Sequence, residues 1–230
     1  MDTLLIGVVL LIILLRELHV AYDVSRQRKT YIQKHHLQNI YPSLLYRTLK
    51  RLCDIIVSLI GCILILPLLY IILGLIIKLT SKGPIIFKQK RYGLFGTEFI
   101  CYKFRSMYQN VSAEKVSNKT DVRITPIGRF MRKSHLDELP QFFNILKGDM
   151  SLVGPRPLPF KEIKKFNKTK EAYSRLLLRP GITGLTQIHS GRQLSTEKYL
   201  QYDNLYVLNP SLIKDISILW QTLKFSDVSF

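Results

Sequence analysis

The sequence feature that most constrains this chain is an uncharged stretch of 23 residues, Ile55–Ile77. At about 1.5 Å of rise per residue, a helix of this length can cross a bilayer core of roughly 30 Å. Pro67 lies near its midpoint, where a proline removes one helical hydrogen bond and clashes with the carbonyl of Ile63. The stretch therefore predicts a helix that is interrupted in the middle.

The charges beside this stretch predict how it meets a membrane. Lys50 and Arg51 precede it, and Lys78 and Lys82 follow it. Basic segments favour the cytoplasmic side, and a single crossing would separate the two flanks. We therefore predict a re-entrant membrane helix over residues 50–80, bent at Pro67 and returning to the face that it entered. An ordinary kinked transmembrane helix is the alternative.

A shorter apolar segment, Thr3–Leu15, lies near the N-terminus. It covers roughly 20 Å as a helix, and it has neither a basic start nor a small-residue cleavage site. We predict an N-terminal hydrophobic anchor over residues 1–18, a basic linker over 19–49 and a cytoplasmic globular domain over 81–230.

The charge balance points to an anionic partner. The chain has 34 Lys and Arg against 16 Asp and Glu, a formal net charge of +18. Nucleic acid, an anionic membrane and a phosphorylated substrate all fit such a surplus. A hydrophobic content of 47% excludes a disordered basic tail. The three cysteines show no metal-binding spacing, and we expect them to be reduced thiols.

The pattern after Gly83 predicts an α+β fold that is mostly helical, with a small β-hairpin and amphipathic interfacial helices. We expect strands over 84–89 and 98–105, joined by a turn over 91–96. A short helix is expected over 127–133, and the next should end near Lys147, with Gly148 as its left-handed stop. Further helices are expected over 161–178, 195–208 and 211–223.

Asp137 and Glu138 are adjacent acids in a chain rich in bases. Pro140 is tolerated in a first helical turn, so the helix should begin near Asp137. Both acids can then reach one site at the irregular helix start. Helix capping is the simpler interpretation of such a pair.

Nearby arginines favour chemistry over capping. Arg132 precedes the acids, and Arg156 and Arg179 lie in turns rich in glycine and proline. Rigid arginines suit bidentate contacts to phosphate. An acid among them could attack phosphorus or hold Mg²⁺ while the arginines neutralise the transferred charge. This pattern predicts phosphoryl transfer.

From about Lys50 onward the chain resembles the bacterial sugar transferase family, the monotopic phosphoglycosyl transferases. The resemblance covers about four-fifths of the chain, and its specificity lies in the order and spacing of the motifs. The matching pieces are Lys50–Asp54, Phe87–Gly93, Tyr102–Met107, Arg123–Arg129, Leu136–Gln141, Asn144–Pro157, Arg179–Gly184 with Gln187, and Asp203–Val207.

The resemblance implies a bacterial inner-membrane enzyme whose catalytic domain, residues 81–230, faces the cytoplasm. Such an enzyme moves a sugar-1-phosphate from a UDP-sugar to undecaprenyl phosphate through a covalent intermediate and releases UMP. Asp137 would be the nucleophile and would lie near Mg²⁺, and Glu138 would be the second acid. The substrate-binding residues would be Lys103, Arg105, Arg132, Arg156, Arg179, Thr183 and Gln187. Membrane lipids would be further partners.

The chain departs from the family pattern at two positions. Leu66 stands where a serine often precedes the membrane proline, which bears on the geometry of the bend. Leu185 stands where an aromatic residue often follows the glycine, which bears on packing or base stacking.

Two rival functions remain open at this point. A membrane-tethered protein that binds anionic lipid or nucleic acid would also explain the charge. The bases are spread through glycine and proline motifs rather than gathered in one tract, so we expect no nucleic-acid partner. A hydrolase that uses the same acids, with water as acceptor, is the second rival. The sugar, the glycan pathway and the oligomeric state are left open.

Overall fold

The computed structural model describes residues 23–37, 42–109, 121–159, 169–189 and 196–224. The chain divides into two compact units, residues 1–39 and 40–230. In the first unit, residues 23–35 form a helix, and the predicted anchor over 1–18 lies outside the described residues. The second unit carries the predicted membrane helix and the predicted site.

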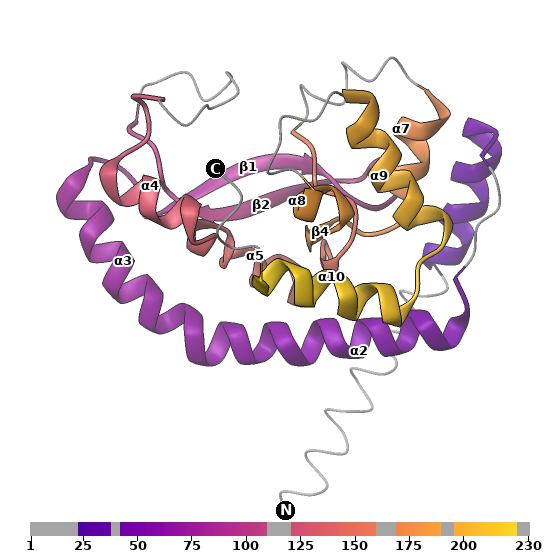
Figure 1. The fold of residues 1–230 in the computed structure, drawn as a ribbon, viewed down its shortest axis with the longest axis horizontal. Coiled ribbons are helices and arrows are strands. Elements are labelled where there is room, and N and C mark those ends of the chain that lie inside the picture. The colour runs from indigo at the N-terminus through magenta and orange to yellow at the C-terminus, as the bar shows by residue number, and fades with distance from the viewer. Residues whose placement is uncertain (1–22, 38–41, 110–120, 160–168, 190–195, 225–230) are drawn as a thin grey trace, which may run out of the picture. The chain divides into compact units, whose positions relative to one another are not determined.

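One long bent helix runs along the second unit (Figure 1). It consists of α2 (Leu44–Ile60), a π-helical turn (Gly61–Ile65) and α3 (Leu66–Thr80). Pro67 lies in the first turn of α3, and the N–H of Leu66 donates to the carbonyl of Gly61, five residues back. The interruption predicted at Pro67 thus takes the form of a wider turn just before the proline. The backbone stays helical through it.

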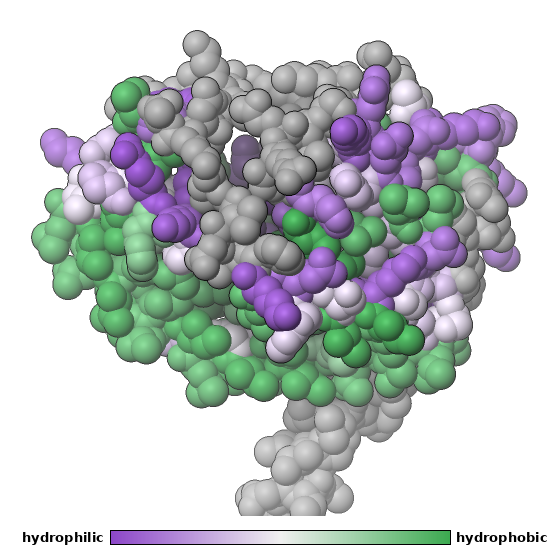
Figure 2. Space-filling view, viewed as in Figure 1, coloured by the Kyte–Doolittle hydropathy of each residue, from purple (hydrophilic) through white to green (hydrophobic). Residues whose placement is uncertain are grey.

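This bent helix exposes apolar side chains along most of its length. Within the described residues, Leu44–Thr80 forms a helix that is long enough and apolar enough to cross a membrane, judged by length and composition. Figure 2 shows the apolar surface along α2 and α3. A narrower stripe faces the domain, where Leu73 and Ile77 pack against Phe104 and Met131. Exposed apolar area of this extent indicates a lipid-facing surface.

The predicted hairpin is confirmed. β1 (Ile86–Tyr92) pairs antiparallel with β2 (Glu98–Phe104), and Phe87 lies opposite Lys103. A 3₁₀ turn over Leu94–Gly96 connects the strands, with Phe95 at φ 54°. Alternate residues of β2, Phe99 and Cys101, enter a core that includes Ile145, Met150 and Tyr206.

The segment that carries the acid pair also folds largely as expected. α4 (Pro126–Lys133) begins after Thr125, whose side chain accepts from the N–H of Gly128. A 3₁₀ turn (Leu136–Glu138) leads to α5 (Gln141–Lys147). Gly148, at φ 93°, ends α5 as predicted.

The remaining elements differ from expectation in two places. β3 (Ser151–Val153) pairs parallel with β4 (Gly181–Thr183), a contact between distant segments that was not predicted. The helix expected over 161–178 begins at Lys170 in its described part, because Thr169 caps α7 (Lys170–Ser174) before a 3₁₀ turn (Arg175–Leu177). The other helices are α8 (Leu185–His189), α9 (Thr196–Leu208) and α10 (Leu212–Lys224), of which α9 and α10 match the predicted spans closely.

α10 lies against α2 through buried polar contacts and exposes its opposite face. Asp215 of α10 accepts hydrogen bonds from Lys50 Nζ at 2.9 Å and from Tyr46 Oη at 3.1 Å. The stripe that points away from these contacts is formed by Ile213, Ile216, Trp220 and Leu223, all exposed. This is the pattern of an amphipathic interfacial helix beside the membrane helix.

Candidate active site

The acid pair lies on the 3₁₀ turn between α4 and α5. His135, with φ at 55°, turns the chain out of α4, and the N–H of Glu138 donates to its carbonyl at 3.1 Å. Pro140, which has no N–H to donate, comes directly before α5. The helix predicted to begin near Asp137 begins instead at Gln141, because the chain first forms a 3₁₀ turn over Leu136–Glu138 and Pro140 stands just before the helix. Both acids lie on this irregular backbone ahead of the helix.

Glu138 is held by two cations from separate elements. Lys103 Nζ, on β2, forms a hydrogen-bonded ion pair with Glu138 Oε1. Arg156 Nη2, in the turn after β3, lies 3.8 Å from the same oxygen. Burial alone would raise the pKa of Glu138, but Lys103 and Arg156 outweigh it and hold that pKa well below its usual range. Glu138 is therefore ionised at neutral pH and fixes both cations.

Asp137 has the opposite electrostatic setting. Its side chain is buried, and burial together with the charge of Glu138 raises its pKa to about 6. Lys103, Arg132 and Arg156 act in the other direction. Arg132 is itself fixed, because its Nε donates to Ser106 Oγ at 2.9 Å. Two neighbouring carboxyls with pKa values pushed apart are typical of a catalytic pair.

Arg105 was predicted to bind phosphate, and the hydrogen bonds of its side chain are with the end of a helix. Its buried guanidinium donates from Nη2 to the carbonyl of Ser81 at 2.8 Å and to that of Ile77 at 3.3 Å. These carbonyls lie at the C-terminal end of α3, where a cation is favoured. Arg105 thus fastens the membrane helix to the hairpin.

Arg179 also caps a helix end. Its Nε donates to the carbonyl of Gly148, at the C-terminal end of α5, at 2.8 Å. Of the five cations chosen from the sequence, the structure brings Lys103, Arg132 and Arg156 to the acids, and it places Arg105 and Arg179 on helix ends.

Thr183 and Gln187, the other two predicted substrate contacts, lie on β4 and α8. Thr183 Oγ1 forms a hydrogen bond with Thr222 Oγ1 of α10 at 2.6 Å. Gln187 Nε2 lies 3.5 Å from the carbonyl of Gly181. These contacts join β4 to its neighbouring helices, and a substrate role for either residue stays a prediction.

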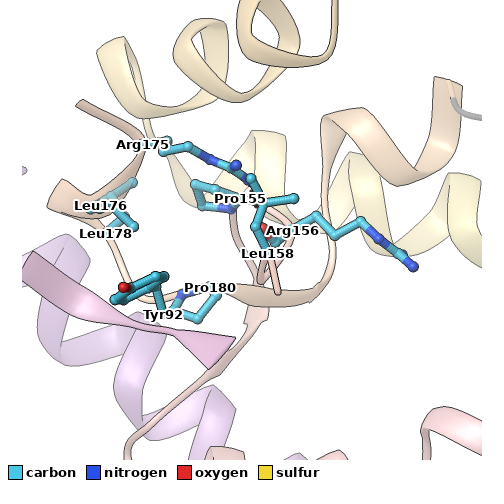
Figure 3. A pocket seen from close by; sticks show the side chains of 8 residues that line it. All are labelled: Tyr92, Pro155, Arg156, Leu158, Arg175, Leu176, Leu178 and Pro180. Carbon is cyan, nitrogen blue, oxygen red and sulfur yellow. Dashed lines mark hydrogen bonds between the residues drawn. The ribbon is translucent and has the colours of Figure 1, made fainter. Parts of the chain in front are cut away.

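Sequence reasoning missed a buried ion pair behind the site. Arg175 Nη2 lies 2.5 Å from Asp203 Oδ2, and both side chains are almost fully buried. Arg175 also donates to the carbonyl of Arg156 at 2.6 Å. Figure 3 shows Arg175 pointing toward the turn of Pro155 and Arg156, while the Arg156 side chain extends away from it. The cavity beside them measures about 10 Å³, room for a single water. Asp203 belongs to a matched motif, but no role for it was predicted from the sequence.

An apolar groove of about 590 Å³ opens beside the bend of the membrane helix. It lies between α3, the hairpin and the start of α5. Its walls are Leu66, Pro67, Tyr70, Ile71, Ile86, Lys88, Tyr102, Phe104, Pro140 and Phe143. A groove with so few polar atoms suits a hydrocarbon chain.

Few side chains among the described residues could serve together as ligands to a metal ion. Within the described ranges, no three His, Cys, Asp or Glu side chains gather where they could hold a metal ion. Mg²⁺ commonly binds through one or two carboxylates together with substrate phosphates. Asp137 fits that mode, because Glu138 is already paired with Lys103.

The site belongs to a segment with extensive similarity to known proteins. The profile of the family described as bacterial sugar transferase matches residues 45–226. The chain is 44% identical over 182 residues to UDP-glucose:undecaprenyl-phosphate glucose-1-phosphate transferase of Klebsiella pneumoniae, covering 76% of this chain and 39% of the relative. It is 37% identical over 206 residues to UDP-N-acetylgalactosamine-undecaprenyl-phosphate N-acetylgalactosaminephosphotransferase of Aeromonas hydrophila, covering 87% and 48%.

A third relative is undecaprenyl-phosphate galactose phosphotransferase of Salmonella typhimurium. It is 41% identical over 196 residues, with 77% of this chain and 40% of the relative covered. The chain spans less than half the length of these relatives. Their names specify three different sugars but the same lipid phosphate.

Proposed function

This chain belongs to the bacterial sugar transferase family, and on that premise we propose that it transfers a sugar-1-phosphate from a UDP-sugar to undecaprenyl phosphate. The reaction releases UMP and begins the synthesis of a polysaccharide or glycoconjugate. The observation that carries the proposal is the convergence of Lys103, Arg132 and Arg156 on two adjacent acids, of which Asp137 is buried and Glu138 partly buried. Positive charge around a buried carboxylate is what phosphoryl transfer requires.

Asp137 is the proposed nucleophile. Its carboxylate oxygen attacks the phosphorus that bears the sugar, a new O–P bond forms, and the bond to the UMP oxygen breaks with its electron pair on UMP. An oxygen of the lipid phosphate then attacks the same phosphorus and restores the carboxylate. With a pKa of about 6, Asp137 is largely ionised at neutral pH and is more basic than an ordinary aspartate.

Three cations serve this exchange. Lys103 and Arg156 are held by Glu138, and Arg132 by Ser106, so their charges are in place before substrate arrives. Charges fixed in advance stabilise the developing transition state without a cost of reorganisation. Glu138 acts as the residue that positions two of them.

Mg²⁺ is the proposed cofactor, with Asp137 as its protein ligand. When bound, the ion neutralises the charge of the diphosphate and weakens the leaving-group bond. Since the described residues offer no closed set of protein ligands, the donor's phosphates would complete the coordination.

The lipid acceptor is proposed to enter from the membrane side. The apolar groove lies beside the bend at Pro67 and reaches Pro140, two residues after Glu138. In this arrangement the polyprenyl chain of the acceptor would lie in the groove and its phosphate would lie near the cations. With the domain on the cytoplasmic face of the inner membrane, the UDP-sugar reaches the same site from water.

The experiment that tests the function measures UMP release from a panel of UDP-sugars, with and without undecaprenyl phosphate. A transferase gives turnover that depends on the lipid. A hydrolase releases UMP and sugar phosphate together, at the same rate with or without lipid. A protein that binds anionic lipid or nucleic acid releases no UMP, and that result would contradict the proposal.

Arg156 and Arg179 should respond differently to the same substitution. Arg156→Lys keeps the charge near Glu138 but loses the bidentate fork, and we expect kcat/KM for the UDP-sugar to fall by roughly 10- to 100-fold. Arg179→Lys should lower the melting temperature while leaving kcat/KM within about threefold of wild type, since its contact is with Gly148. Equal kinetic losses in both variants would show that Arg179 also binds substrate.

Removal of divalent cations should stop UMP release, and added Mg²⁺ should restore it. A matched measurement with Ca²⁺, which prefers longer bonds and more ligands, should restore less activity. The control is the melting temperature, which should not change with the chelator, because the site is completed by substrate rather than by the protein alone. Full activity in excess chelator would exclude a metal requirement.

A further inference from the structure

The turn that carries Arg156 is bound by side chains from elements other than the 3₁₀ turn that carries the acid pair. The sequence Gly154-Pro155-Arg156-Pro157 follows β3, and prolines on both sides of Arg156 restrict the backbone. The two prolines limit the backbone dihedral angles of the turn, but they do not determine where the turn lies relative to the acid pair. Contacts with other elements must do that.

The backbone of Arg156 is anchored by one buried ion pair. Arg175 Nη2 donates to the carbonyl of Arg156 at 2.6 Å, and the backbone N–H of Arg156 favours the ionised Asp203 carboxylate, acting to lower a pKa that burial raises. Arg175 Nη2 lies 2.5 Å from Asp203 Oδ2. Thr186 Oγ1 adds a hydrogen bond to Asp203 Oδ1 at 2.5 Å. Side chains from the 3₁₀ turn after α7, from α8 and from α9 therefore form one connected polar cluster beside Arg156.

The side chain of Arg156 extends from this held backbone toward Glu138, with Nη2 at 3.8 Å from Oε1. Figure 3 shows the Arg175 side chain directed at the turn and the Arg156 guanidinium directed away. An arginine that binds phosphate needs a backbone that is held in place, because a displacement of its guanidinium by about 1 Å can lower the rate on the order of 100-fold.

We propose that Arg175 and Asp203 are positioning residues that set where the Arg156 guanidinium stands beside the acid pair. This inference rests on the proposed function for its kinetic consequences but not for its structural ones. Neither residue touches the reacting atoms, and they act through the backbone of Arg156.

The structural test follows hydrogen exchange at the Arg156 amide in the full chain in detergent or nanodiscs. In Asp203→Asn and in Arg175→Lys we expect that amide to exchange roughly tenfold faster, since the first removes the charge that the amide favours and the second weakens the hydrogen bond that anchors the Arg156 carbonyl. Asp215→Asn is the matched control, because Asp215 is also a buried acid paired with a cation, Lys50, and contacts Tyr46 and Tyr206. It should leave the Arg156 amide unchanged. Unchanged exchange in Arg175→Lys and Asp203→Asn would overturn the inference, whatever reaction the enzyme performs.

The kinetic test is a double-mutant cycle on UMP release. Arg175→Lys should lower kcat/KM by roughly tenfold in the wild-type background and by less than about twofold in an Arg156→Ala background, because the positioned group is then gone. A role in general packing would cost the same factor in both backgrounds, and that outcome would also overturn the inference. If the wild type releases no UMP, the proposed function fails, and the exchange measurement still decides the positioning role.

Discussion

Asp137→Asn is expected to lower turnover by on the order of 10³-fold or more, because the amide cannot form the covalent phosphosugar intermediate. The fold should survive the change. Burial and the charge of Glu138 raise the pKa of Asp137 to about 6, so its ionised form destabilises the folded state as pH rises through that value. A neutral amide removes this cost at pH 7.

The measurement is UMP release together with capture of the labelled phosphosugar on the protein. Wild type should retain label from a UDP-sugar radiolabelled in the sugar when lipid is withheld, and Asp137→Asn should retain none. Glu98→Gln, an exposed acid on the hairpin, is the matched control and should behave as wild type. Near-normal activity in Asp137→Asn would contradict the assignment of Asp137 as the nucleophile.

Glu138→Gln should also lose most activity, for a different reason. Without the carboxylate, Lys103 and Arg156 lose the partner that holds them, and two cations in a partly buried site repel each other. The variant should still be able to form the covalent intermediate, but slowly. The contrast between the two acids separates the nucleophile from the residue that organises its surroundings.

The second large effect concerns membrane topology, and its outcome is all or none. Cysteines placed at Thr48 and at Lys82, both exposed, should be labelled only from the cytoplasmic side in a protein whose Cys53, Cys62 and Cys101 have been replaced. A re-entrant helix keeps both flanks on one side, whereas a spanning helix puts them on opposite sides. Labelling of Thr48→Cys from outside would contradict the re-entrant topology.

Pro67→Ala should then change that pattern. The alanine supplies a backbone donor and removes the clash, a change in helix stability of about 3 kcal/mol. We expect the π-helical turn over Gly61–Ile65 to relax toward a straight α-helix that crosses the bilayer. Activity should be lost although the catalytic residues are unchanged. Pro84→Ala, outside the helix, is the control and should keep both the labelling and the activity of wild type.

Much of the local structure was predictable because its causes are local. The alternation of apolar residues predicted the hairpin and Gly148 predicted the end of α5. Pro140 indicated a helix start close to the acid pair, although α5 begins at Gln141 rather than near Asp137. The interruption at Pro67 followed from the chemistry of proline, but its form did not. A π-helical turn at Gly61 depends on how the whole helix packs against the domain, where the ring of Phe142 lies directly beside Gly61.

The tertiary structure decided which cations lie beside the acid pair. Five lysines and arginines in rigid or motif positions were equivalent by sequence, yet Arg105 and Arg179 meet the carbonyls at the ends of α3 and α5. A guanidinium binds a phosphate or a helix end with the same donors, so residue type cannot distinguish the two uses.

The parallel pairing of β3 with β4 and the grip of Arg175 and Asp203 on Arg156 are contacts between segments far apart in the chain. No local periodicity records which distant segments will meet, because that choice is made by the packing of the whole core. The sequence by itself determined which chemical groups are present, namely two adjacent acids and a surplus of bases, and it predicted a bent apolar helix. The fold determined which three of those bases reach the acids, since burial and distance, rather than composition, decide which charges interact.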